Sequence, residues 1–318
     1  MAGFTDAAFR SLCWEKHCAL ALTELANAEG IVRDSGQTLH LLETWPGEHP
    51  VGAHIYGSDP ARMAAAAAVI EGMHRFDFID INAGCPVRKI VMKGAGAGLI
   101  KDPDRLFHIV QSVKNAVKLP VTVKTRIGVS KARVNGIEVL RACEAAGASA
   151  IFIHARVASA KHAGPADWDA LAQLKAASAI PVVGNGGIAG PDDVVAMIAH
   201  TGVDGVMIGR AAIGNPWVFE EIVCRLRGAE ARPHGDDELR AMIGEHFDRL
   251  LSLKSREKAV RPRAHFTPER GTAMAFRAHL IRYLAGRPGT LQLRRWLNSL
   301  RSKTDILQAV DRVLETRA

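Results

Sequence analysis

The sequence predicts an α/β protein of the (β/α)8 TIM-barrel class, with the first barrel strand missing or truncated and a small all-α domain after the barrel. Three observations lead to this prediction. Short β-branched, apolar runs alternate strictly with longer amphipathic segments, which indicates parallel strands joined by helical crossovers. The 318 residues are enough for one barrel of about 250 residues and a small additional domain. After residue 228 only helical patterns remain.

Seven segments carry the pattern of a buried strand. They are Ala19–Leu22, Val51–Ile55, Phe78–Ile81, Val121–Lys124, Ala150–His154, Pro181–Val183 and Gly205–Ile208. The amphipathic helical segments between and after them are Ala61–Gly72, Asp104–Val117, Gly136–Ala146, Asp167–Ala177 and Pro191–His200. The chain begins with a loop and a helix over residues 7–16, where a barrel begins with a strand. We therefore expect an eighth strand upstream of Met1, lost through a truncated or misassigned start, with a natural barrel of seven strands as the alternative.

The chain divides into two predicted domains, a flavin-binding barrel over residues 1–228 and a basic helical domain over residues 235–318. Their charges differ. Residues 1–224 hold 21 Lys and Arg against 22 Asp and Glu, whereas residues 225–318 hold 20 against 11. A basic surface confined to one domain is typical of proteins that bind a polyanion such as RNA. A solvated basic face kept for solubility is the alternative explanation.

Composition argues against several other classes of protein. The five cysteines lie far apart, with no C-x-x-C pair and no Cys/His cluster at zinc spacing, so we expect a reduced, cytoplasmic protein without a metal site. No apolar run reaches the roughly 18 residues of a membrane span, and the first residues carry charges where a signal peptide is apolar. The oligomeric state stays open, with a monomer as the simplest expectation.

In barrels of this class the functional residues lie at the carboxyl ends of the strands. Two glycine-bearing loops follow the last two predicted strands, Gly184-Asn185-Gly186-Gly187 and Gly209-Arg210. Glycines let backbone amides approach an anion closely, and an arginine supplies a fixed charge. These loops therefore predict a phosphate site, such as one for FMN. Glycines that serve only as turns are the alternative.

Lys124 and His154 extend consecutive strands toward the barrel mouth, where a cation can stabilise negative charge on a reduced flavin. Each could instead be a hydrogen-bonded core residue. Cys85 lies on a Gly/Pro loop after the third predicted strand, close in sequence to Lys89 and Lys93. The other four cysteines fall within or beside helical or strand patterns. Cys85 is therefore the one placed to reach a substrate and donate a proton.

Several motifs in one order carry a resemblance to a known family. They are Met1-Ala2-Gly3-Phe4-Thr5-Asp6, Gly57-Ser58-Asp59-Pro60, Asn82-Ala83-Gly84-Cys85-Pro86, Gly94-Ala95-Gly96, Lys124-Thr125-Arg126, His154-Ala155-Arg156, Ala166-Asp167-Trp168, Gly184-Asn185-Gly186-Gly187 and Ile208-Gly209-Arg210. With them the chain resembles the bacterial tRNA-dihydrouridine synthases of the DusB-like group. The match runs from Met1 to about Phe219 and continues weakly into the helical domain.

The resemblance implies an FMN-binding barrel with a tRNA-binding helical domain, in which NADPH reduces the flavin and the flavin reduces uridine. Cys85 would protonate C5 of the base, with Asn82 and Arg156 binding the uracil. The residues implied for FMN are Lys124, His154, Asn185, Gly186, Gly187, Gly209, Arg210 and, where the family usually has a glutamine, His54. The residues expected to contact the tRNA backbone are Lys89, Lys93, Arg277, Arg282, Arg294 and Arg295.

Two alternatives stay open at this point. A different FMN-dependent barrel reductase, similar to a dihydroorotate dehydrogenase and acting on a free small molecule, would explain the barrel residues but not the basic helical domain. Retention on tRNA would separate it from the first hypothesis. A non-catalytic RNA-binding relative would have lost its flavin through the truncation and the change to His54. A colourless protein that takes up no FMN would favour this second alternative.

Overall fold

The computed structural model describes residues 3–260 and 267–316. Met1 and Ala2 of the predicted amino-terminal motif lie outside these residues. Contacts divide the chain into two compact units, one formed by residues 1–3 and 19–209 and the other by residues 4–18 and 210–318. The amino-terminal helix therefore belongs to the same unit as the carboxyl-terminal helices. The functional boundary expected between residues 228 and 235 stays a prediction.

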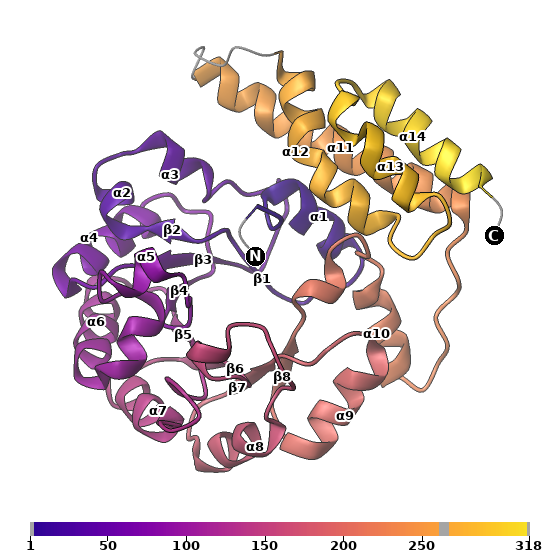
Figure 1. Cartoon of the computed structure of the whole chain (residues 1–318). Coiled ribbons are helices and arrows are strands. Elements are labelled where there is room, and N and C mark those ends of the chain that lie inside the picture. Colours follow the sequence, from indigo (N-terminus) through magenta and orange to yellow (C-terminus); the bar gives the residue numbers. More distant parts are fainter. Residues whose placement is uncertain (1–2, 261–266, 317–318) are drawn as a thin grey trace. The chain divides into compact units, whose positions relative to one another are not determined.

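The larger unit is built on a parallel sheet that curls, with helices on its outer side (Figure 1). The strands follow the order β1-β3-β4-β5-β6-β7-β8, and β2 also pairs with β3. They are β1 Ala21–Leu22, β2 Ala26–Asn27, β3 Val51–Tyr56, β4 Phe78–Asn82, β5 Val121–Arg126, β6 Ala150–His154, β7 Val182–Asn185 and β8 Gly205–Met207. All seven predicted strands are present, and the TIM-barrel-like fold class is confirmed. Among the described residues no ladder joins β8 to β1, so the sheet is a half-barrel.

The helices of this unit follow the strands on the outer face of the sheet. They are α2 Ala28–Val32, α3 Gly36–His40, α4 Pro60–Glu71, α5 Arg88–Val91, α6 Pro103–Ala116, α7 Gly136–Ala145, α8 Trp168–Ala177 and α9 Pro191–Thr201, with the 3-10 helices η1 Gly96–Lys101 and η2 Ala158–Ala160. Helices α4, α6 and α8 are each preceded by an N-cap aspartate, Asp59, Asp102 and Asp167, whose carboxylates accept hydrogen bonds from backbone amides of the first turn. Such caps satisfy amides that have no partner within the helix.

The two faces of the strands differ in chemistry because side chains alternate along a strand. Apolar residues such as Ile79, Val121 and Ile151 belong to the buried core shared with the helices. The alternate positions of β5, Thr122, Lys124 and Arg126, are polar and face the inside of the curl. The sequence alternation thus separates a packing face from a face that can carry chemistry.

The short strands β1 and β2 are two parts of one edge strand interrupted by an extra residue. The register shows four residue steps along this edge against three along β3, which is the geometry of a bulge. Thr23 lies in the interruption, and its hydroxyl accepts a hydrogen bond from the backbone amide of His54 at 2.9 Å. The bulge therefore holds the β3 backbone at His54. The sequence did not predict β2.

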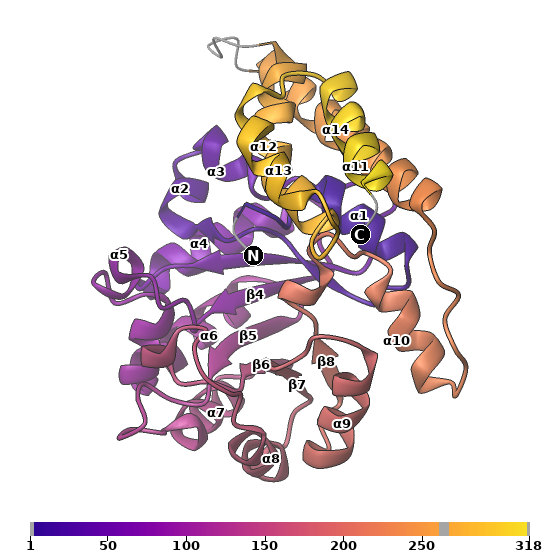
Figure 2. The same ribbon diagram turned by 45° about the vertical axis from the view of Figure 1, so that its right-hand side comes forward.

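The second unit is all helical, as predicted for the carboxyl-terminal region (Figure 2). Its helices are α1 Ala7–Glu15, α10 Val218–Leu226, α11 Asp236–Val260, α12 Pro268–Tyr283, α13 Thr290–Trp296 and α14 Lys303–Glu315, with the 3-10 helices η3 Arg210–Ala212 and η4 Leu297–Ser299. Helix α11 packs against α1, α12 and α14. The core between these helices contains Ile243, Phe247, Phe276 and Val310, all fully buried.

Two buried histidines, His246 of α11 and His279 of α12, lie in this core with their ring centroids 4.5 Å apart. Phe9 of α1 packs on both rings. His246 Nδ1 lies 3.0 Å from the Tyr283 hydroxyl, whereas His246 Nε2 and both nitrogens of His279 have no partner among the described residues. Burial lowers the pKa of His279 to about 4 and lowers the pKa of His246 well below its usual value. Both rings are therefore neutral near pH 7.

We expect the helical unit to lose stability as the pH falls from about 6.5 through about 4. A histidine in the unfolded chain binds a proton as the pH falls through about 6.5. In this core burial opposes protonation of the ring, so acid stabilises the unfolded chain relative to the folded one. For His279 the loss amounts to about 3 kcal/mol once the pH is below its folded pKa. Thermal unfolding followed by circular dichroism at pH 4.5 and 7.5 should show a smaller pH effect in His279→Leu than in the wild type.

The exposed His108 of α6 provides the control, since its replacement by leucine removes a histidine that is not buried. His108→Leu should keep the wild-type pH effect. An unchanged pH effect in His279→Leu would show that His279 does not cause the acid sensitivity.

Candidate active site at the carboxyl ends of the strands

The parallel register stacks polar residues of neighbouring strands into three rows on the inner face of the sheet. From the amino toward the carboxyl ends, the rows are His54-Asp80-Thr122, Asn82-Lys124 and Arg126-His154-Asn185. Within β4 and β5 these residues occupy alternate positions, so the pleat directs them to the same face. We refer to them as the inner polar rows. Five of these eight residues were predicted as candidates from the sequence, and each of the other three lies two positions from one of them along a strand.

Asp80, in the first row, is a fully buried carboxylate with two partners. Its Oδ2 lies 2.5 Å from Nδ1 of His54, and its Oδ1 accepts from the Thr122 hydroxyl at 2.6 Å. The other ring nitrogen of His54, Nε2, lies 2.9 Å from Nδ2 of Asn82. An amide nitrogen only donates, so His54 Nε2 accepts and the ring proton is on Nδ1. His54 then donates this proton to Asp80.

Asn82 connects the first row to the loop that carries Cys85. Its Oδ1 accepts hydrogen bonds from the backbone amides of Cys85 at 2.9 Å and Gly84 at 3.3 Å. Because backbone amides only donate, these contacts fix which end of the Asn82 side chain faces the loop. The Cys85 carbonyl accepts in turn from the amide of Ala97 at 2.9 Å. The Cys85 backbone is thus held on both sides, with its side chain partly buried.

Two further contacts pack the Cys85 loop. Arg126 donates from Nε to the Gly84 carbonyl at 2.8 Å and from Nη1 to the Lys161 carbonyl at 2.7 Å. Gly96, at the start of η1, has φ +56°, and a Cβ there would lie 2.8 Å from the Cys85 carbonyl oxygen. Only glycine allows this close approach without strain. The loop position therefore depends on both Arg126 and Gly96.

The inner polar rows carry positive charge near the strand ends. Burial lowers the pKa of Lys124 to about 8, while Asp80 and Cys85 act to raise it. Burial also lowers the pKa of Arg126 to about 10. At pH 7 both side chains therefore keep their charge, but Lys124 loses its proton as the pH rises above about 8. The arrangement suits an anionic group or developing negative charge.

His154 is neutral in this cationic surrounding. Burial, followed by the charges of Arg126 and Lys124, lowers the pKa of His154 to about 2. Its Nε2 lies 3.1 Å from Nη1 of Arg156, and because a guanidinium only donates, His154 accepts this hydrogen bond. Arg156 also donates from Nε to the Gly164 carbonyl at 3.0 Å. The pair presents a fixed guanidinium and an uncharged imidazole.

The glycine loop after β7 lies directly against this pair. Gly186 and Gly187 have φ values of +108° and +84°, and a Cβ on Gly186 would lie 2.7 Å from Cδ2 of His154. The Gly186 carbonyl accepts from Nε1 of Trp168 at 3.1 Å. Side chains are thus excluded here by both backbone conformation and space. A bare backbone of this kind is what close approach to an anion requires, and the predicted contact of these glycines with a cofactor stays a prediction.

The ends of β7 and β8 are joined by Asn185, whose Nδ2 donates to the Met207 carbonyl at 2.7 Å. A Cβ on Gly209 would lie 4.0 Å from the same nitrogen. The backbone of Gly209, just after β8, is therefore close to the Asn185 side chain. Arg210 is exposed and belongs to the second unit. Its predicted role toward a phosphate stays a prediction.

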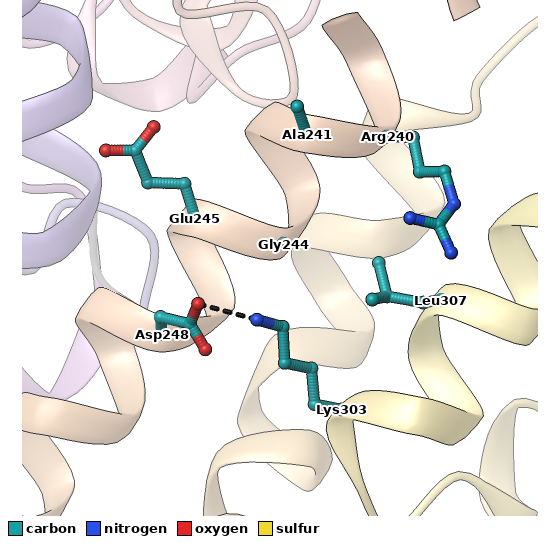
Figure 3. Close-up of a pocket in the computed structure, with 7 residues that line it drawn as sticks. All are labelled: Arg240, Ala241, Gly244, Glu245, Asp248, Lys303 and Leu307. Atoms are coloured by element: carbon teal, nitrogen blue, oxygen red, sulfur yellow. Dashed lines mark hydrogen bonds and ion pairs between the residues drawn. The ribbon is translucent and has the colours of Figure 1, made fainter. Parts of the chain in front are cut away.

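Two surface hollows lie outside the inner polar rows. One, of about 300 Å³, lies between α11 and α14 (Figure 3). Lys303 Nζ donates to Asp248 Oδ2 across it at 2.6 Å, so these charges pair with each other. The other, of about 520 Å³, lies at α5 and is lined by Arg88, Lys89, Met92 and Lys93. It places both predicted lysines on one basic surface.

Among residues 3–260 and 267–316, no group of three or more His, Cys, Asp or Glu side chains is arranged to hold a metal ion. In the same part of the chain, no helix combines the length and the apolar character needed to cross a membrane.

A family model described as dihydrouridine synthase (Dus) matches residues 1–318. The chain belongs to the dihydrouridine synthase family. The resemblance predicted from the motifs is thereby confirmed.

Curated relatives agree with this membership. The tRNA-dihydrouridine synthase B of Yersinia pestis is 36% identical over 320 residues, covering 100% of this chain and 95% of the relative. That of Pseudomonas putida is 36% identical over 302 residues, covering 94% and 85%. A probable tRNA-dihydrouridine synthase of Treponema pallidum is 40% identical over 230 residues, covering 70% and 68%. Among solved structures, a nitroalkane oxidase from Streptomyces ansochromogenes matches with a TM-score of 0.41 and 17% identity, over 67% of this chain and 64% of that chain.

Within the family fold, three inner residues were not singled out from the sequence. They are Asp80, Thr122 and Arg126, which hold His54 and the Cys85 loop. The available signal was alternation, because each lies two positions from Asn82 or Lys124 and so shares their face. That signal indicates a face but not which partner each side chain takes.

The residues predicted to contact RNA fall into two groups. Lys89, Lys93, Arg282, Arg294 and Arg295 have exposed side chains. Arg277 is partly buried and donates from Nη2 to the backbone carbonyls of Asn298 at 3.1 Å and Leu300 at 2.9 Å. Arg277 therefore also supports the connection between α13 and α14. Contact with RNA stays a prediction for all six.

We expect Gly96→Ala to destabilise the larger unit by more than about 1–2 kcal/mol, which is the cost of holding an alanine in the left-handed backbone conformation. The added Cβ would also collide with the Cys85 carbonyl. Gly202→Ala is the matched control, because Gly202 has φ +68° with open space around its Cβ position. Denaturant unfolding of both variants gives the comparison. Equal losses would show that Gly96 is required only for its backbone conformation and not for packing the Cys85 loop.

Proposed function

We propose that the protein is a cytoplasmic tRNA-dihydrouridine synthase that reduces the C5=C6 bond of uridine in tRNA, with FMN as cofactor and NADPH as reductant. Family membership supports the reaction class. The single observation that carries the assignment of roles is the Cys85 loop. Asn82 holds the backbone amide of Cys85, whose partly buried thiol lies near the cationic end of the inner polar rows. This supports Cys85 as an acid whose conjugate base the neighbouring charges would stabilise.

The residues present fit an anionic flavin nucleotide. A Cβ on Gly186 would collide with His154, and a Cβ on Gly187 would lie 3.2 Å from Ala166, so the backbone here carries no side chain and its amides can approach a phosphate closely. Lys124, His154 and Asn185 would hold the cofactor from the strand ends, with Gly209 and Arg210 completing the set after β8. His54 is a further predicted contact. When bound, FMN supplies to C6 of the uracil a hydride that it has received from NADPH.

The chain itself supplies the proton that completes the reduction. Hydride addition at C6 leaves carbanion character at C5, and the Cys85 thiol donates its proton to C5. The thiolate that remains is stabilised by Lys124 and Arg126, whose pKa values Cys85 raises. It recovers a proton from solvent. Because Lys124 is deprotonated above about pH 8, this stabilisation weakens at alkaline pH.

The substrate base would be held by Asn82 and Arg156. One hydrogen of the Asn82 amide nitrogen faces His54, which leaves the second to donate to a uracil carbonyl. A uridine in folded tRNA must leave its stack before it can reach such a site. The basic helical unit would supply the electrostatic contacts to the RNA backbone that hold the tRNA meanwhile.

Cys85→Ala should leave FMN binding, tRNA binding and flavin reduction by NADPH unchanged, because those steps use other groups. Base reduction should slow by about 10²–10⁴-fold, the usual contribution of a positioned acid. Stopped-flow mixing of pre-reduced enzyme with unmodified tRNA measures this step through flavin reoxidation. Cys224→Ala, in α10, is the control and should react at the wild-type rate. Wild-type reoxidation by Cys85→Ala would mean that the proton comes from another group.

The double variant Arg294→Gln/Arg295→Gln should weaken tRNA binding and make it less dependent on salt. Each lost phosphate contact lowers the slope of log K against log[salt] by about 0.7–0.9. Filter binding between 50 mM and 200 mM salt would measure the slope, with Arg33→Gln on the exposed surface of the larger unit as control. If neither affinity nor slope changes, the tRNA does not lie on α13. If the wild type also fails to retain tRNA, a small-molecule reductase becomes the better hypothesis.

A further inference from the structure

We propose that Asp80, His54 and Thr122 form a positioning relay that fixes the orientation of the Asn82 amide and, through it, the loop carrying Cys85. The catalytic meaning of this relay rests on the proposed role of Cys85. The relay itself consists of hydrogen bonds between side chains and backbone groups of this chain. It gives His54 a role distinct from contact with a cofactor.

The direction of every hydrogen bond in the relay follows from Asp80. A carboxylate only accepts, so the Thr122 hydroxyl and His54 Nδ1 both donate to it. His54 Nε2 is then an acceptor, and it faces the Asn82 amide nitrogen at 2.9 Å. Asn82 must therefore turn its oxygen to the amides of Gly84 and Cys85. A flipped Asn82 would place a carbonyl oxygen against the lone pair of His54 and two N–H donors against the loop amides.

Burial stabilises this orientation of the donors and acceptors in the relay. Asp80 is 0%, Asn82 6% and His54 9% exposed, so water has little access to replace a lost partner. Each misdirected contact would leave a buried polar group unsatisfied. The Thr23 hydroxyl holds the His54 backbone from the neighbouring edge strand, which keeps the ring between Asp80 and Asn82. The relay thus transmits one fixed orientation from the sheet interior to the active loop.

His54 offers a cleaner test than Asp80. The charge of Asp80 also acts on Lys124, so replacing Asp80 would change two things at once. His54→Leu removes both hydrogen bonds of the ring and keeps an apolar side chain of moderate size. His54→Gln keeps one donor and one acceptor in the side chain, so it can preserve both contacts. His49→Leu is the matched control, since His49 also pairs with a carboxylate, Asp77, at 3.1 Å but lies before β3.

The first measurement is the rate of Cys85 alkylation by iodoacetamide in protein free of flavin and RNA. A Cys18→Ser/Cys224→Ser background removes the other two cysteines that are not buried. We expect His54→Leu to change the alkylation rate by about tenfold. This is the effect on a conformational equilibrium of losing one hydrogen bond, here the one between His54 and Asn82. His54→Gln and His49→Leu should stay within about twofold of the parent on the same scale. Equal rates for His54→Leu and the parent would overturn the proposal.

The second measurement is the tautomer of His54, read from nitrogen-15 NMR of histidine-labelled protein and assigned through the signals absent in His54→Gln. A proton on Nδ1 is expected, and a proton on Nε2 would overturn the proposal. In the loaded enzyme, His54→Leu should slow flavin reoxidation by tRNA, with His54→Gln restoring reoxidation. If alkylation and tautomer agree with the relay but no dihydrouridine forms, the proposed function fails while the relay stands.

Discussion

The buried carboxylate of Asp80 is the interaction on which the rest of the site depends. A charge with no access to water is tolerated only when hydrogen bonds satisfy it, and here the donors are His54 and Thr122 on the two neighbouring strands. These donors reach Asp80 only in the observed register, in which all three residues form one row. A slip by one residue would turn one of them to the packing face. The polar row therefore helps to specify the pairing of β3, β4 and β5.

Side chains alternate along each strand, so apolar residues face the helices and polar residues that can carry chemistry face the inside of the sheet. Outward residues such as Ile79 and Val121 are fully buried in the core, so the packing of the unit does not rely on the inner polar rows. The inner side can then hold Lys124, Arg126 and a neutral His154 close together, although burial lowers the pKa of each. Cations held in this way need no reorganisation when negative charge develops.

Local patterns in the sequence predicted the seven strands, the helices after them and the loops at their carboxyl ends, because alternation, caps and glycines act over a few residues. Cys85, Asn82 and Lys124 were found for the same reason. The partners of Asp80, Thr122 and Arg126 were not, because they depend on register between strands about 26 to 42 positions apart. The packing of α1 with α11, through Phe9 and His246, depends on an even longer separation. For Arg277 the sequence suggested only contact with RNA at the surface, because the residue is charged. Its hydrogen bond to the Leu300 carbonyl, which supports a turn, was not predicted.

The proposed reaction of this chain is the reduction of uridine in tRNA with electrons from a flavin. The most direct measurement uses tRNA from a strain lacking the gene, incubated with the protein, FMN and NADPH, and analysed for dihydrouridine by mass spectrometry of its nucleosides. We expect dihydrouridine to form at defined tRNA positions only when protein and reductant are both present. A protein that binds FMN and is reduced by NADPH, yet leaves every uridine of this tRNA unchanged, would contradict it.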